Sequence, residues 1–361
     1  MPHLASMFLH FPANEVERQP RATTPHSRAA SKNPTQPRSR GPRFGVIAEA
    51  EVESMRALIG AGRGKRTYVD YIEAAERYLI PFFGQRQISE LSGELIDAFD
   101  SWRISQLGRV PKQSTQRNHA SAFARVVARL RREGHWDERL PLPRLNVGGA
   151  RSEARPAFSD EEVERLLAFM PQWAEQGPRS GSEVMRRLCW SYVEFLLYTG
   201  MRTGTEALNV RWQHLQWHHS GGERFLKIWV SGKTGPRELI ARREVLPCLE
   251  RLIQWGAPER HSVEDMLARP LQRYVFVLPT GRRPHMFVGI FSRLMRDSGL
   301  QKDASGRLNR SLYSLRHTYA TQALARGVDI HTLARQMGTS VAMLEKHYSK
   351  LTPMLAAGKL A

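Results

Sequence analysis

The chain has 361 residues, 41% of them hydrophobic, which is enough for two compact domains with tails. Its 54 Lys and Arg outnumber its 35 Asp and Glu and give a formal net charge of +19, which indicates a polyanionic partner, with nucleic acid favoured over an anionic membrane. The sequence has no apolar run of the roughly 20 residues that span a membrane and no signal-peptide pattern. Cys189 and Cys248 lack CxxC spacing, which argues against a disulfide framework or a thiolate metal site. We therefore expect a cytoplasmic, nucleoid-associated protein that does not bind membranes.

The N-terminal part of the chain changes in composition along its length. Residues 1–45 are rich in Pro, Ser, Thr, Arg and Gln, which predicts a flexible basic arm. We interpret residues 46–62 as a connecting segment. Apolar residues recur at helical spacing in residues 63–140, which are predicted to form a small helical domain. Within this domain, Pro81 and Gly84 are expected to break the first helix.

The last helix of this domain is predicted to be amphipathic. Its apolar face holds Phe123, Val126, Val127 and Leu130. Its candidate contacts for DNA phosphates are Arg117, Arg125, Arg129 and Arg132. A solvated helix surface is the alternative interpretation, but acidic residues are nearly absent between Gln116 and Arg132, which favours a DNA-facing surface.

A second domain is predicted after a short linker. Residues 141–156 contain three Pro and two Gly with little periodicity, which is typical of a linker. Residues 157–350 then form the second domain, and Ser159 followed by three acidic residues predicts the capped start of its first helix. Residues 351–361 are predicted to form a C-terminal tail.

An arginine lies on a predicted turn between two helices of the second domain. The segment Tyr198-Thr199-Gly200-Met201-Arg202 ends an apolar helical run, and a second helical segment containing Glu206 follows. An isolated arginine at such a junction is most often a surface residue or a carbonyl ligand. The role of Arg202 therefore has to be inferred from the residues around it.

A β-hairpin is predicted next, with Lys233 at its turn. Leu226, Ile228 and Val230 alternate on one face, and residues 237–241 form the returning strand. The Gly232-Lys233-Thr234 turn is not a phosphate-binding loop, because that motif requires a glycine five residues before Gly232 and the residue there is a lysine.

Three nearby histidines allow a metal site to be considered. They are His214, His218 and His219, and the only carboxylate near them in the sequence is Glu223. We interpret these histidines as part of an exposed strand and predict no metal site.

The C-terminal region combines an arginine and a tyrosine in distinctive segments. Tyr313-Ser314-Leu315-Arg316-His317 begins a helical run that ends near Gly327. Thr339 follows Gly338 further on, and Tyr348 lies nine residues after Thr339, directly behind His347.

Together these segments resemble the tyrosine recombinase (phage integrase) family. The Thr-Gly-x-Arg turn at Arg202, with a Glu and a Trp after it, resembles the segment of the family's first catalytic arginine. Residues 315–321 closely resemble the segment of the second arginine, and the residues around Tyr348 are similar to the nucleophile segment. The resemblance extends from about Arg63 to Leu351.

The resemblance implies roles for specific residues. The implied catalytic residues are Arg202, Lys233, Tyr313, Arg316, Thr339 and Tyr348. The implied supporting residues are Glu206, His317 and His347. In this family two arginines hold the phosphate, the hairpin lysine is the general acid and the tyrosine is the nucleophile. Tyr313 stands where the family usually has a histidine, and Thr339 where it has a histidine or a tryptophan.

The resemblance also implies a fold, a reaction and partners. The fold would be mainly α with a small β-sheet, with a helical core-binding (SAM-like) domain followed by an α+β catalytic domain. The protein would cleave and rejoin double-stranded DNA recombination sites through a 3′-phosphotyrosine, without metal or ATP, to integrate or excise a mobile element. It would act as a homotetramer, with an accessory DNA-bending protein as a further partner, and its tail would dock on a neighbouring subunit.

Two alternatives share the predicted fold. One is a catalytically degenerate DNA-binding protein, for which Tyr313 and Thr339 would be signs of lost activity. The other is a type IB topoisomerase-like enzyme, which relaxes supercoils by the same chemistry without paired sites.

Overall fold

Two compact units make up the chain, and the first ends at Ser152. The computed structural model describes residues 41–149, 155–176, 180–232, 235–256, 262–269, 271–306 and 309–348, and leaves out the side chains of 180–182, 256 and 348. The division falls within the predicted linker, residues 141–156. The predicted arm up to residue 40 and the predicted tail lie outside the described residues.

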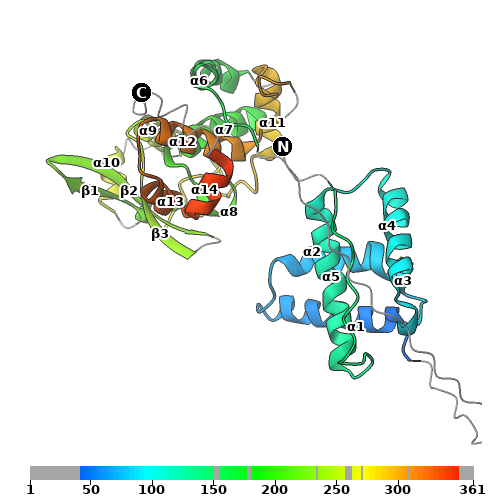
Figure 1. Ribbon diagram of the computed structural model, residues 1–361. Helices are drawn as coiled ribbons and strands as arrows, with labels where there is room; N and C mark the ends of the chain where they lie inside the picture. The colour runs from blue at the N-terminus through cyan, green and yellow to red at the C-terminus, as the bar shows by residue number, and fades with distance from the viewer. Residues whose placement is uncertain are drawn as a thin grey trace, which may run out of the picture. The chain divides into compact units, whose positions relative to one another are not determined.

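The described part of the first unit is helical (Figure 1). Its elements are α1 (Phe44–Gly60), α2 (Thr67–Ala74), the π-helical turn η1 (Ala75–Leu79), α3 (Ile80–Phe83), the 3₁₀ turn η2 (Ile88–Glu90), α4 (Gly93–Leu107) and α5 (Gln113–Arg132). Aromatic rings form the centre of its core, and Phe83 lies 5.3 Å from Phe44, 4.9 Å from Phe99 and 5.4 Å from Phe123, measured between ring centroids. The apolar face predicted for the last helix is buried in the same core.

Helix α1 corrects two expectations about the first unit. It begins at Phe44, inside the arm predicted for residues 1–45, and the predicted connecting segment, residues 46–62, is helical up to Gly60. One face of this helix, including Phe44, belongs to the core. Ile47, Val52 and Met55 are buried at spacings that place them on one helix face. This segment is therefore part of the first unit rather than a connection to it.

The expected break at Pro81 is also corrected. Helical structure continues from α2 through η1 into α3 and ends at Phe83, before Gly84. The N–H of Ile80 bonds to the carbonyl of Ala75, five residues back, which widens the turn just before Pro81. Because a π turn shifts the backbone carbonyls out of α-helical register, it accommodates a proline ring that would clash inside a regular α-helix.

The second unit combines helices with one sheet in its described part (Figure 1). Its helices are α6 (Asp160–Glu175), α7 (Ser180–Thr199), α8 (Thr205–Leu208), η3 (Trp212–His214), α9 (Val245–Gly256), α10 (Val263–Leu267), α11 (Val288–Asp297), α12 (Leu312–Ala325), α13 (Ile330–Met337) and α14 (Val341–Tyr348). The predicted cap of the first helix is confirmed: the Ser159 hydroxyl accepts the Glu162 N–H, and the Glu162 carboxylate accepts the Ser159 N–H. This reciprocal pair satisfies two N–H groups at the start of α6.

The sheet contains the predicted hairpin. Its strands are β1 (Leu215–Ser220), β2 (Glu223–Gly232) and β3 (Gly235–Ile240), antiparallel and in that spatial order. The hairpin of β2 and β3 is confirmed, because Gly232 pairs with Gly235 across its end. The predicted buried face is also confirmed, with Leu226, Ile228 and Val230 all in the core. Lys233 lies outside the described residues.

The last three helices pack on one another through a small apolar cluster. Tyr319 of α12, Leu333 and Met337 of α13, and Leu344 of α14 are buried together in it. This packing holds the end of α13 against the middle of α12. No helix within the described ranges combines the length and apolarity needed to cross a membrane.

Candidate active site

The turn after α7 holds Arg202 at the edge of a charged cluster. Gly200 has a φ of +65°, and a Cβ at this position would collide with the ring of Tyr319, so the tight turn requires glycine. The Arg202 guanidinium donates to the Glu206 carboxylate over 3.1 Å and to the Gly338 carbonyl. Its backbone N–H also donates to Glu206, over 3.1 Å. Both the main chain and the side chain of Arg202 are therefore fixed.

Arg316 lies inside the second unit and is 3% exposed. Its guanidinium donates to the Gly200 carbonyl over 2.6 Å and to the Met337 carbonyl over 2.7 Å. Burial, opposed by Tyr313 and assisted by the nearby charge of Arg202, lowers the pKa of Arg316 to about 10. Arg316 still carries its positive charge at neutral pH.

Glu206 is the acidic member of the cluster and is buried between two arginines. It accepts from Arg202 and from Arg237 of β3, the latter over 2.6 Å. Burial alone would raise the pKa of Glu206, but the hydrogen bond and charge of Arg237, with those of Arg202, lower it below its usual value. Glu206 is therefore ionised at neutral pH.

Sequence analysis missed Arg237. The signal was present in the strand alternation, because Arg237 shares the inward face of β3 with the buried Leu239. An arginine at an inward strand position is unusual, since a buried guanidinium needs partners. Here its partners are Glu206 and the Gln336 carbonyl, the latter 3.1 Å from Nε.

The guanidinium groups of all three arginines form hydrogen bonds to the C-terminal end of α13. Arg237 donates to the carbonyl of Gln336, Arg316 to that of Met337 and Arg202 to that of Gly338. The last carbonyls of a helix have no partner within the helix and carry its partial negative charge. Three guanidinium groups thus meet at three consecutive carbonyls.

A row of aromatic rings borders the cluster. The ring of His317 lies 5.1 Å from that of Tyr313 and 5.6 Å from that of His347. His317 is buried, and burial lowers its pKa to about 4, with further contributions from His347 and Arg316. His317 is therefore neutral at physiological pH. Tyr313 is 40% exposed at the start of α12.

Thr339 and Tyr348 follow the end of α13. Thr339 is half-buried, and its N–H bonds to the Ala334 carbonyl at the left-handed C-cap formed by Gly338. Tyr348 is the last residue of α14, and its side chain lies outside the described atoms. The ring of His347, the residue before Tyr348, lies 5.6 Å from that of His317, so the end of α14 lies close to the residue that follows Arg316.

Comparison with known proteins identifies the family. The family model described as the phage integrase family matches residues 157–353 of this chain. The chain belongs to the phage integrase family. The match begins at the residue predicted to start the second domain and includes the whole arginine cluster.

Individual relatives agree with this assignment. Curated integrase/recombinases of Escherichia coli and Pseudomonas aeruginosa are each 25% identical to this chain over 335 residues, which is 83% of this chain and 88% of the relative. Among solved structures, the XerH recombinase bound to difH DNA matches 85% of this chain and 84% of its own, with a TM-score of 0.59 at 14% identity. The Tn1549 transposon integrase matches 84% of this chain and 94% of its own, with a TM-score of 0.55 at 16% identity. These tyrosine recombinases confirm the predicted fold class.

The predicted DNA-contacting arginines of this integrase-family chain are divided between two environments. Arg125 and Arg129 bind the buried Glu51 of α1, at 2.5 Å and 3.5 Å, and Arg132 lies 3.5 Å from the same carboxylate. The local sequence of α5 lacks acidic residues, but α1 supplies one from a distant position. Arg125 and Arg129 therefore connect α5 to α1, whereas Arg117 and Arg132 are exposed.

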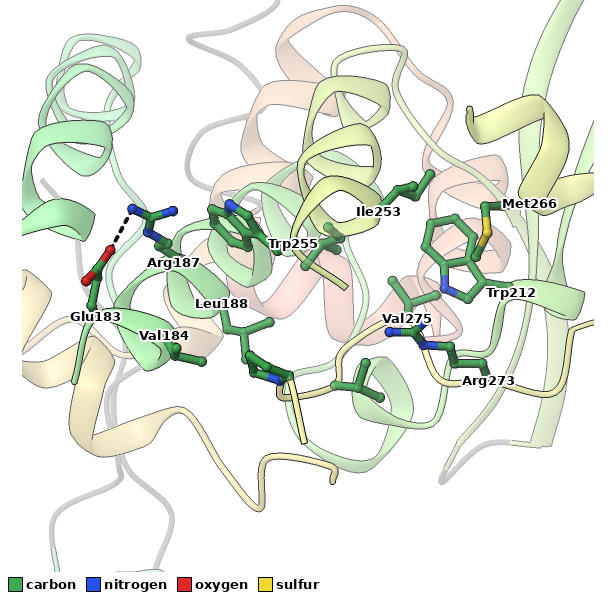
Figure 2. Close-up of a pocket in the computed structure, with 13 residues that line it drawn as sticks. Glu183, Val184, Arg187, Leu188, Trp212, Ile253, Trp255, Met266, Arg273 and Val275 are labelled. Carbon is green, nitrogen blue, oxygen red and sulfur yellow. Dashed lines mark ion pairs between the residues drawn. The ribbon is translucent and has the colours of Figure 1, made fainter. Parts of the chain in front are cut away.

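A cavity of about 280 Å³ lies elsewhere in the second unit of this family member. Figure 2 shows its apolar lining, with Trp212, Trp255 and Met266 around it and the Glu183–Arg187 ion pair at one end. Of the predicted catalytic residues whose side chains the structure describes, Arg202, Tyr313, Arg316 and Thr339, none lines this cavity. The charged cluster at the end of α13 is therefore a separate site.

Proposed function

We propose that the chain is a site-specific recombinase that cleaves and rejoins DNA through Tyr348. The observation that carries this proposal is the cluster at the end of α13, where Arg202 and Arg316 are fixed on adjacent carbonyls. Two guanidinium groups can each bind nonbridging phosphate oxygens and stabilise the charge that develops during attack on phosphorus. Tyr348 ends the next helix, where the ring of the preceding His347 lies 5.6 Å from that of His317, and we propose that this brings the nucleophile within reach of a phosphate bound at the cluster.

The proposed reaction conserves the energy of the broken bond. The Tyr348 oxygen attacks the scissile phosphorus and loses its proton, a 3′-phosphotyrosine bond forms, and the bond from phosphorus to the 5′ oxygen breaks. Lys233 is proposed to give the leaving 5′ oxygen a proton. A 5′ hydroxyl from a second strand then attacks the phosphotyrosine and releases Tyr348. Each strand exchange breaks one phosphodiester and makes one, so the proposal requires no metal or ATP.

Tyr313 and Thr339 are proposed to donate hydroxyl hydrogen bonds to the phosphate. Both flank the arginine cluster, Tyr313 one helical turn before Arg316 and Thr339 directly after Gly338. A hydroxyl donates without carrying charge, so these residues would orient the phosphate rather than balance its charge. His317 and His347 would hold the surrounding side chains in place.

The relatives suggest the biological setting of the proposed reaction. One solved relative is a lambda integrase tetramer bound to a Holliday junction, which matches 86% of this chain with a TM-score of 0.53 at 14% identity. By analogy with it and with the Tn1549 transposon integrase, we propose that a homotetramer acts on paired DNA sites of a mobile element, aided by a DNA-bending protein. Arg117 and Arg132 are the exposed arginines proposed to contact phosphates from α5.

A covalent adduct tests the proposal directly. The purified protein is incubated with DNA flanking its own gene, carrying a nick near the cleavage site so that the cut end diffuses away. Wild type should form an adduct that survives denaturing electrophoresis. Tyr348→Phe should bind the same DNA without forming it, and Tyr198→Phe, which removes a half-buried hydroxyl of α7, should form it as wild type does.

The outcomes separate the alternatives. An adduct that persists in Tyr348→Phe would refute the nucleophile. Salt-sensitive binding by wild type with no adduct on any flanking DNA would favour the degenerate DNA-binding protein. An adduct accompanied by relaxation of supercoiled DNA carrying a single site, with no exchange between paired sites, would favour the topoisomerase-like enzyme.

A further inference from the structure

Arg237 connects the hairpin to the charged cluster. Its side chain is 11% exposed, and its guanidinium donates to Glu206 over 2.6 Å and to the Gln336 carbonyl over 3.1 Å. The Gln336 side chain in turn bonds the backbone N–H and carbonyl of Ile240, so two residues of β3 are bonded to Gln336 of α13. Figure 1 shows α13 beside the sheet. The position of the Arg237 guanidinium is therefore determined by contacts on both sides.

The charges of the cluster depend on this residue. Arg202, Arg237 and Arg316 are positive and Glu206 is negative, which leaves two net positive charges among these four side chains. A phosphodiester carries one negative charge, and its pentacoordinate transition state carries two. Without Arg237, Arg202 would be the one arginine within the described ranges bonded to Glu206, and one net positive charge would remain on the cluster.

Glu206 lowers the net positive charge of the cluster, but its carboxylate also has a structural role. Its carboxylate accepts the backbone N–H of Arg202 and thereby fixes the turn. A Cβ on Gly232 would collide with the same carboxylate, so the end of β2 also packs directly against it. A carboxylate in this position attracts the Arg202 guanidinium, and a second cation is needed to balance that attraction.

We propose that Arg237 is a positioning residue for strand cleavage, and that it acts as the counter-charge of Glu206 so that the charge of Arg202 remains available to the phosphate. This inference rests on the proposed function. Arg237 does not touch the DNA in this role. Lysine would preserve the charge but not both hydrogen bonds, because its ammonium lacks the planar fork that reaches the carboxylate and the carbonyl together.

A double-mutant cycle tests this inference. The variants are Arg237→Gln, Glu206→Gln and the two combined, with Arg224→Gln as matched control, since Arg224 is an exposed arginine of the same sheet. Cleavage is measured as the single-turnover rate of adduct formation on the nicked DNA, at saturating protein. DNA affinity and thermal unfolding are measured for every variant.

The expected result is a strong coupling between the two positions. Arg237→Gln should lower the cleavage rate on the order of 100-fold, a loss comparable to that of one transition-state hydrogen-bond donor, while DNA affinity changes by less than about 3-fold. Arg237→Lys should recover part of this rate. In the Glu206→Gln background, Arg237→Gln should change the rate by less than about 3-fold, because no carboxylate remains to be balanced.

Two results would overturn the inference while the proposed function stands. One is an Arg237→Gln rate close to that of an active wild type. The other is an equally large effect of Arg237→Gln with and without Glu206, which a purely structural role would produce. If Arg237→Gln alone does not fold, Glu206→Gln can still be compared with the double variant, since neither contains a buried unpaired carboxylate. A large difference between their cleavage rates would then overturn the inference. Absence of an adduct from wild type would instead overturn the proposed function itself.

Discussion

The buried His317 is expected to make the stability of the second unit depend on pH. It is 7% exposed, and burial lowers its pKa to about 4, assisted by the charges of His347 and Arg316. In the unfolded chain the same imidazole has a pKa of about 6.5. Between these two values the unfolded state binds a proton that the folded state does not bind, so acidification favours unfolding.

The size of this effect follows from the two pKa values. Above pH 6.5 the imidazole is neutral in both states and contributes no pH dependence. As the pH falls, its contribution to the free energy of unfolding decreases by about 2 kcal/mol at pH 5 and about 3 kcal/mol at pH 4. The loss is complete only below the folded pKa, where both states bind the proton.

Urea unfolding of wild type and His317→Gln at pH 7 and pH 5 measures this contribution. Wild type should lose about 2 kcal/mol more than the variant over this interval. His119 of the first unit also has a pKa lowered to about 4 by burial, but it is present in both proteins and cancels in the difference. His331→Gln, at an exposed histidine of α13, should behave as wild type. Equal losses in wild type and His317→Gln would refute the reasoning.

Further predictions concern other buried groups. Gly338→Ala should lower the free energy of unfolding by at least about 1 kcal/mol and slow cleavage, because Gly338 has a φ of +62° and a Cβ would lie 2.7 Å from the Arg237 Nη1. Thermal unfolding and cleavage like those of wild type would contradict this. Glu51→Gln should destabilise the first unit by about 3 kcal/mol in urea unfolding, since it leaves Arg125 and Arg129 without their buried counter-charge. A change below about 0.5 kcal/mol would mean that solvent already screens these charges. Burial raises the pKa of both the Cys189 and Cys248 thiols, so iodoacetamide at pH 8 should label neither until urea is added, and native labelling would show that they are accessible.

Features that depend on neighbouring residues could be predicted from the sequence. The cap at Ser159 needs only the next three residues, and the buried face of β2 follows from alternation along one strand. The turn at Arg202 was predicted from the residues on either side of it. In each case the information lies within a few residues, which is the range of hydrogen-bonding and periodicity patterns.

Contacts between distant segments could not be predicted in the same way. Glu51 binds Arg125 from 74 residues away, so the basic face of α5 looked unpaired in its local sequence. The pairing of Glu206 with Arg237 joins residues 31 positions apart and depends on how the hairpin packs on α8. The charge pattern of a single helix therefore overestimates the number of its arginines that are available to DNA when another element supplies a buried carboxylate.

The end of α13 explains how the arginine cluster can keep its positive charge before the proposed phosphate binds. A carboxylate that fixed Arg316 would also neutralise it, whereas the carbonyls of Gly200 and Met337 fix it while remaining uncharged. The lowered pKa of Arg316 is the electrostatic consequence, because its buried charge is incompletely compensated. A phosphate would supply the missing negative charge without displacing an existing carboxylate partner. Helix-end carbonyls are thus suited to hold guanidinium groups in position for the proposed reaction. Glu206 fixes the turn through the backbone N–H of Arg202, and we propose that Arg237 balances its charge.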